Sequence, residues 1–201
     1  MTLRRGVELV DAVMKHRRDA GESFEGLPPD ELKQTKLGTQ PLSPALERWL
    51  AADAEYFSLS EPMTLRELLV QEFGDDWAEA FEPLPSELKA PVVLLEGWGS
   101  DSRRFLYLGP RDAAGEPCIM TVDMDDMPFF CVNGPVDVWL AQQAGLLEDE
   151  QVYGHVPAEY EPARLEHARL HFGGYVCWGD GMRSRTLDLE DGDVEGEDEE
   201  E

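Results

Sequence analysis

Apolar residues recur at helical spacing through the first part of the chain. The predicted helices span residues 2–19, 43–55, 64–73 and 77–81. The helix over 2–19 is amphipathic, because its apolar side chains share one face and most of its bases lie elsewhere. Ser43 followed by Pro44 is a good start for the next helix. Thr64 and Glu67 form a capping-box pattern before the third, which is expected to stop at Gly74.

The pattern changes in the middle of the chain to short apolar runs. They cover residues 92–95, 105–108, 118–122 and 129–132, with glycine-rich or acidic turns between them. Connections this short leave no room for crossover helices, so the runs are predicted to be antiparallel neighbouring strands. A helix after Gly134-Pro135, a helix over 162–171 and a strand over 174–178 should follow. The predicted fold class is α+β, an antiparallel β-meander sheet with helices packed on one face.

Charge divides the chain further. The 201 residues carry 43 acids against 17 lysines and arginines, a formal net charge of −26. Residues 188–201 hold ten of the acids and no base, which leaves −16 on residues 1–187. We therefore expect an N-terminal amphipathic helix (1–25) appended to an α+β domain with a C-terminal extension (26–187), and a disordered acidic tail (188–201).

Such a surplus of acids repels nucleic acid and anionic membranes and attracts basic partners. Solubility alone accounts for the charge equally well. Because of this charge, nucleic acid is not an expected partner. No signal peptide and no apolar stretch of membrane-spanning length are visible, so a membrane is not an expected partner either. The three cysteines, Cys118, Cys131 and Cys177, are widely spaced among apolar neighbours and are interpreted as buried free thiols. These features predict a cytoplasmic protein.

Two clusters could carry metal chemistry. Asp123, Asp125 and Asp126 alternate as in a cation-binding or phosphotransferase loop, but Met127 follows and no such motif is completed, so a solvated hairpin turn is favoured. His167 and His171 stand four residues apart on a predicted helix without the order or third ligand of a zinc hydrolase. Surface histidines are the favoured interpretation, with metal binding as the alternative.

No catalytic motif emerges elsewhere. The Gly-x-Gly pairs at 97–99 and 179–181 lack the Lys-Ser/Thr of a phosphate loop, and no nucleophile elbow is present. We therefore predict no cofactor and no enzyme activity. Trp49, Trp77 and Trp139 lie on apolar helix faces and are predicted core residues. Trp98, flanked by glycines at a strand end, either anchors a partner or caps the core.

Three stretches carry a resemblance to a known family. They are 32–38 with 40–50, 92–101 with 105–108, and 117–126 leading to 136–140. This layout resembles the SUKH superfamily, best known as bacterial immunity proteins and a fungal cell-wall regulator. The likeness covers roughly residues 30–145. The chain departs from the family pattern at 54–57, where Asn-Gly-Gly is missing, in its additional N-terminal helix, and beyond residue 145.

The resemblance implies a non-catalytic domain that binds a protein partner. Together with the charge, it predicts an immunity protein that neutralises a basic toxin, such as a nuclease or deaminase domain, by occluding its active surface. The residues predicted to bind the partner are Asp75, Asp76, Trp98, Asp123, Asp125 and Asp126. The alternatives are an intracellular scaffold or regulatory protein, and a metal-dependent hydrolase that uses the turn acids and the two histidines.

Overall fold

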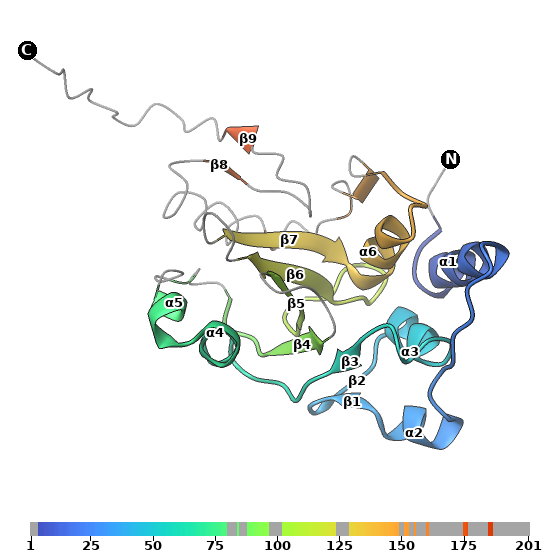
Figure 1. Cartoon of the computed structure of the whole chain (residues 1–201), viewed down its shortest axis with the longest axis horizontal. Coiled ribbons are helices and arrows are strands. Elements are labelled where there is room, and N and C mark those ends of the chain that lie inside the picture. Colours follow the sequence, from blue (N-terminus) through green and yellow to red (C-terminus); the bar gives the residue numbers. More distant parts are fainter. Residues whose placement is uncertain are drawn as a thin grey trace, which may run out of the picture.

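The computed structural model describes residues 4–79, 84, 88–96, 102–123, 129–148, 151–152, 155, 160, 175–176 and 185–186. Its helices are α1 (Val7–Asp19), α2 (Pro29–Gln34), α3 (Pro44–Leu50), α4 (Leu65–Phe73), α5 (Asp75–Glu79) and α6 (Val136–Gln143). Its strands are β1 (Lys36–Leu37), β2 (Gln40–Pro41), β3 (Ser58–Leu59), β4 (Val92–Glu96), β5 (Ser102–Tyr107), β6 (Cys118–Asp123), β7 (Phe129–Pro135), β8 (Tyr175–Val176) and β9 (Arg185–Thr186). Figure 1 shows their arrangement.

The central element is an antiparallel sheet in the order β3-β4-β5-β6-β7. Four of these strands are the runs expected from the sequence, so the predicted α+β meander is confirmed. The fifth, β3, is a two-residue edge strand that pairs Leu59 with Leu95. The pairs β1-β2 and β8-β9 form separate two-stranded sheets.

Helices cover both faces of the sheet, so the prediction of helices on one face was wrong. Along β4, Val93 and Leu95 belong to the core under α1, α3 and α6. Val92 and Leu94 belong to a second core with α4 and Ala78 of α5. Figure 1 shows the two helix groups on opposite sides of the strands. The physical reason is visible in the sequence, because strands buried on both faces have continuous apolar runs instead of alternating ones.

The predicted helix starts at Ser43 and Thr64 are confirmed. The Ser43 side chain accepts a hydrogen bond from the Leu46 N–H at 3.4 Å. At α4, Thr64 and Glu67 form the reciprocal capping box, and the helix ends before Gly74, whose φ is 87°. These side chains satisfy backbone N–H groups that a helix start leaves unpaired.

Other boundaries differ from the expectation. The first helix begins at Val7 instead of residue 2, because Gly6 has a φ of 64° and its N–H bonds to a distant carboxylate. The helix from Ser43 ends at Leu50 instead of 55, and α5 begins at Asp75 instead of Trp77. The helix predicted over 162–171 lies outside the described residues, and β8 falls within the strand predicted over 174–178.

Candidate partner-binding surface

Two connections leave the sheet at the same end of its strands. Because neighbouring strands are antiparallel, β4 and β6 run in the same direction. The chain therefore leaves both strands at the same end of the sheet. Residues 97–101 follow β4 and residues 124–128 follow β6. The pairing of Ser102 with Asp123 joins the two hairpins there. We call this end of the strands the turn end of the sheet.

The structure describes three of the six predicted partner-binding residues, Asp75, Asp76 and Asp123. Asp123 is the last residue of β6 at the turn end. Trp98 belongs to the first connection, and Asp125 and Asp126 to the second, so all three lie outside the described residues.

Helix α5 begins beside the turn end. The Arg103 Nε donates to Glu72 Oε2 at 2.6 Å, and its guanidinium lies 5.4 Å from the centre of the Phe73 ring. Arg103 is the residue after Ser102, so these contacts tie the C-terminal turn of α4 to the start of β5. Asp75 follows Phe73 by two residues, which places the exposed Asp75 and Asp76 next to this edge.

The acids of α5 are not neutralised by neighbours. Asp75, Asp76 and Glu79 are exposed, and within the described part of the chain none of them forms an ion pair. In α1 the acids behave differently, since Glu8, Asp11 and Asp19 each pair with a base. The negative potential of α5 is therefore available to a partner.

Helix α4 contributes one further exposed acid, Glu67. The helix also carries a shallow hollow lined by Thr64, Arg66, Glu67, Val70 and Gln71. Hydrogen bonds from the Thr64 N–H and hydroxyl lower the pKa of Glu67, so this carboxylate stays charged at neutral pH. We call Glu67, Asp75, Asp76 and Glu79 together the α4–α5 acidic surface.

Several charged residues instead lie inside the molecule, around Arg5. Its Nε donates to Asp137 Oδ2 at 2.8 Å and its Nη2 to Asp137 Oδ1 at 2.9 Å, a bidentate pair. Asp112 is a further ion-pair partner of the same guanidinium, and His155 Nδ1 lies 3.4 Å from Nη1. Asp137 also accepts the Gly6 N–H at 2.6 Å. This cluster joins the residue before α1 to the start of α6.

Two titratable groups near Arg5 have shifted pKa values. Glu116 is fully buried, and burial raises its pKa, although hydrogen bonds from Ser43 and the Ala45 N–H oppose the shift. Burial, with a further contribution from the positive charge of Arg5, lowers the pKa of His155. Perturbed groups of this kind occur at active sites and also in structural ion-pair networks. Here both shifts are caused chiefly by burial where α1, α3 and α6 meet.

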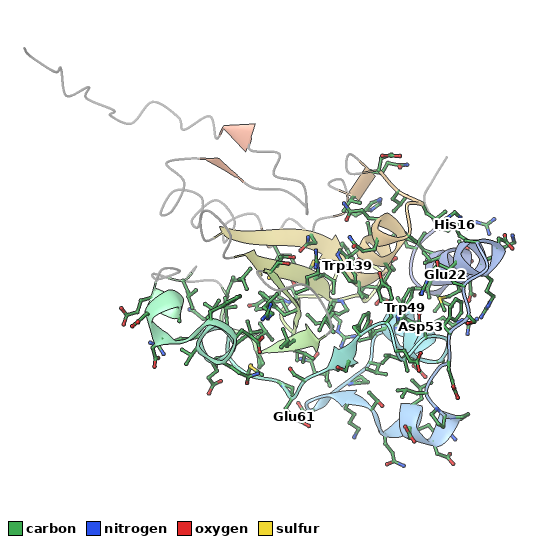
Figure 2. All side chains as sticks on the ribbon, viewed as in Figure 1. His16, Glu22, Trp49, Asp53, Glu61 and Trp139 are labelled. Carbon is green, nitrogen blue, oxygen red and sulfur yellow. The ribbon has the colours of Figure 1, made fainter. Side chains whose placement is uncertain are left out.

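A second partly buried arginine lies at the other end of α1. Arg17 bonds to Asp53 at 2.6 Å and pairs with Glu22 at 2.8 Å. Its guanidinium lies 4.9 Å from the Phe24 ring centre, 5.3 Å from Trp49 and 4.9 Å from Tyr56. Figure 2 shows Glu22, Trp49 and Asp53 on this side of the molecule.

Sequence reasoning did not identify the acids that pair with Arg5 and Arg17. These acids look like surface acids in the sequence, and Arg5 is 132 positions from Asp137. A signal for their burial exists only for Asp137, which stands in an otherwise apolar stretch after Pro135.

The remaining sequence predictions concern cysteine, histidine and tryptophan. Cys118 is buried, and burial raises its pKa strongly, as expected for a free thiol of the core. Trp49 and Trp139 are buried as predicted. The side chains of Trp77 and Cys131, and Cys177, His167 and His171 altogether, lie outside what the structure describes. Among the described residues, no group of three or more metal-ligating side chains converges, and no helix has the length and apolar character to cross a membrane.

Comparison with known proteins gives little further information. No family model matches the chain, and no curated protein matches it. One solved structure is similar, that of an uncharacterized protein from Salmonella enterica subsp. enterica serovar typhimurium str. 14028s. The identity is 14%, the alignment covers 84% of this chain and 91% of that one, and the TM-score is 0.44. These comparisons assign neither a family nor an activity to the chain.

Proposed function

We propose that the chain is a non-catalytic binding protein that neutralises a basic bacterial toxin. In this proposal, the α4–α5 acidic surface and the adjoining turn end cover the part of the toxin that grips nucleic acid. The observation that carries it is the group of exposed acids on α5, none of which forms an ion pair within the described residues, beside the end of the sheet where Ser102 pairs with Asp123. The SUKH-like sequence layout supports the same class of function.

The physical basis is charge complementarity. Nuclease and deaminase domains bind phosphates through lysine and arginine, so their substrate surfaces are positive. Carboxylates facing such a surface accelerate association and discriminate against acidic proteins. A complex of this kind weakens as salt rises, because the Debye length falls to about 8 Å at physiological ionic strength.

The first test uses charge reversal with a matched control. The tagged chain captures partners from a lysate of the cells that make it, and a captured basic protein is purified for binding measurements. The D75K/D76K variant should bind that protein at least about tenfold more weakly, chiefly through slower association. The E25K/E55K variant changes two exposed acids far from α5 along the chain and makes the same net-charge change, so it should bind nearly as well as the parent chain.

The second test concerns activity. The purified partner should degrade or deaminate nucleic acid, and one equivalent of the chain should stop it. Equal weakening by both double variants would show that net charge alone drives binding and would remove the α4–α5 acidic surface from the proposal. A partner without any such activity would instead favour the scaffold alternative. Metal analysis of the purified chain tests the hydrolase alternative directly.

A further inference from the structure

Helix α5 has few contacts of its own that hold it in place. It has only five residues, too few for a helix to be stable without packing. Among the α5 residues whose side chains the structure describes, Ala78 alone is buried, and a methyl group buries little apolar surface. Gly74, with a φ of 87°, links α5 to the end of α4. The position of α5 therefore depends on how the last turn of α4 is held (Figure 1).

Arg103 of β5 holds this turn against the sheet. It lies on the face of the sheet that α4 covers, because Val122 opposite it on β6 and Phe105 two residues further along β5 both belong to that core. The Nε–Glu72 bond and the contact with the Phe73 ring therefore join the sheet directly to the C-terminal turn of α4.

The ion pair between Arg103 and Glu72 is sheltered from water. The two side chains are 21% and 17% exposed, and Glu72 Oε1 also accepts from Gln71 Nε2 at 3.1 Å. The pair between Arg48 and Asp11 has the same N–O distance of 2.6 Å, but these side chains are 40% and 49% exposed. Shelter strengthens a charge-assisted bond, whereas an exposed pair contributes little. Arg48 is thus a matched control for Arg103.

We propose that Arg103 is a positioning residue for the α4–α5 acidic surface. It keeps Asp75 and Asp76 where the basic groups of a partner meet them, and it does not itself bind the partner. The role of the partner rests on the proposed function, but the holding of α5 by Arg103 does not. Removing Arg103 makes the chain more acidic, so simple charge attraction and positioning predict opposite changes in affinity.

The first measurement needs no partner. Amide hydrogen exchange is followed at Gly74 and Ala78, whose N–H groups form backbone hydrogen bonds of 2.9 and 3.0 Å, and at Leu108, whose N–H forms one of 2.9 Å next to the sheet. In R103Q, the amides of Gly74 and Ala78 should exchange at least about tenfold faster, and that of Leu108 should change less. Equal acceleration at all three sites would mean that Arg103 only stabilises the fold as a whole, and would overturn the proposal.

A double-mutant cycle tests whether Arg103 acts through Glu72. E72Q and R103Q should each accelerate exchange at Ala78, and the double variant should be accelerated about as much as either single variant, because all three lose the same contact. Additive effects would contradict this. R103K keeps the charge but not the planar guanidinium, so it should retain part of the protection. It replaces R103Q if that variant does not fold.

The second measurement uses the basic protein captured with the tagged chain. R103Q and R48Q each add one unit of net negative charge, so charge attraction alone would make both variants bind this partner slightly more tightly. Positioning instead predicts that R103Q binds at least about threefold more weakly, because the acids are no longer pre-organised for the partner. R48Q should bind at least as tightly as the parent chain.

Each outcome of the binding measurement decides a different claim. Binding of R103Q as tight as that of R48Q would overturn the positioning role, even if the partner and its activity support the proposed function. A chain with no basic partner would contradict the proposed function and the binding step of this inference together. Faster exchange at Ala78 in R103Q would still assign the position of α5 to Arg103.

Discussion

At the residue scale, the acids of this chain serve two opposite purposes. Most of the acids that the structure describes are exposed, but Asp53, Glu116 and Asp137 are buried in the core. Each of these three is compensated by an arginine or by a backbone N–H. The arginines that pair with Asp53 and Asp137, and the Ala45 N–H that Glu116 accepts, lie 36 to 132 positions away from them. Burial of a carboxylate depends on such partners, so the sequence could not identify Asp53 and Glu116, and it signals Asp137 only through its apolar neighbours.

Glu116 gives a pH-dependent prediction. Burial raises the pKa of Glu116 in the folded chain above the ordinary value of 4.5. At a pH between 4.5 and that raised pKa, the folded chain holds a proton that the unfolded chain has lost. The contribution of Glu116 to the free energy of unfolding therefore falls as pH rises through that window. Glu116→Gln removes this dependence and keeps an acceptor for the Ala45 N–H. The variant should gain stability relative to the parent chain between about pH 4.5 and pH 7, by about 1.4 kcal/mol for each pKa unit of the shift.

Urea unfolding of both chains at the two pH values measures this difference. His155 has the opposite effect on stability. Because its pKa is lowered in the folded chain, its contribution to the free energy of unfolding is lost as pH falls below 6.5. To first order that contribution cancels in the comparison, since both chains contain His155. The control is Glu25→Gln, which removes an exposed acid and changes the net charge by the same amount. A Glu116→Gln difference that does not vary with pH would contradict the prediction.

At the element scale, the features that could be predicted are those with a local cause. The caps at Ser43 and Thr64 act within three residues, and the four central strands were visible as apolar runs. The strands β1, β2 and β3 have only two residues each, too few to show a period. The helix from Ser43 stops early for a tertiary reason, since Asp53 turns back to accept the Tyr56 N–H and to bind Arg17.

The segment after α1 provides the prediction at this scale. Residues 25–27 run along the end of α3, where Leu27 N–H donates to the Leu50 carbonyl at 2.8 Å. A Cβ at Gly26 would lie 2.1 Å from the Ala51 carbonyl oxygen, which is backbone and cannot move aside alone. Gly26→Ala should therefore destabilise the fold by about 1–3 kcal/mol through overpacking. Thermal unfolding measures the loss against Ser23→Ala, an exposed neighbour that should change little; equal stability of the two variants would contradict this account.

At the scale of the whole molecule, topology explains how much of the candidate site could be predicted. In an antiparallel meander every second connection follows a strand at the same end of the sheet. The connections that contain Trp98 and Asp125 could therefore be assigned to one end from the sequence. The position of α5 could not be predicted in the same way. It depends on Arg103 bonding to Glu72, a contact between elements separated by 31 positions.

The net charge of the whole chain leads to the last prediction. With −26 in 201 residues, repulsion among the exposed acids should destabilise the folded state at low salt. Ion pairs such as Arg4–Glu8 and Lys15–Asp19 oppose this only weakly, because both partners are exposed. Raising NaCl from about 0.01 M to about 0.15 M shortens the Debye length from about 30 Å to about 8 Å and should raise Tm.

A gain of about 1 kcal/mol corresponds to a rise of about 2–4 °C for a chain of this size. Truncation after Thr186 removes the ten acids of the tail and lowers the net charge to −16, so its Tm should respond less to salt. Differential scanning calorimetry of both chains at the two salt concentrations measures this. An equal response would mean that the repulsion originates within residues 1–186 alone, and that the tail is too far from the fold on average to act on it. A Tm that falls with salt would mean that attractive pairs outweigh the repulsion, and the charge of the folded part would then stabilise the fold instead of straining it.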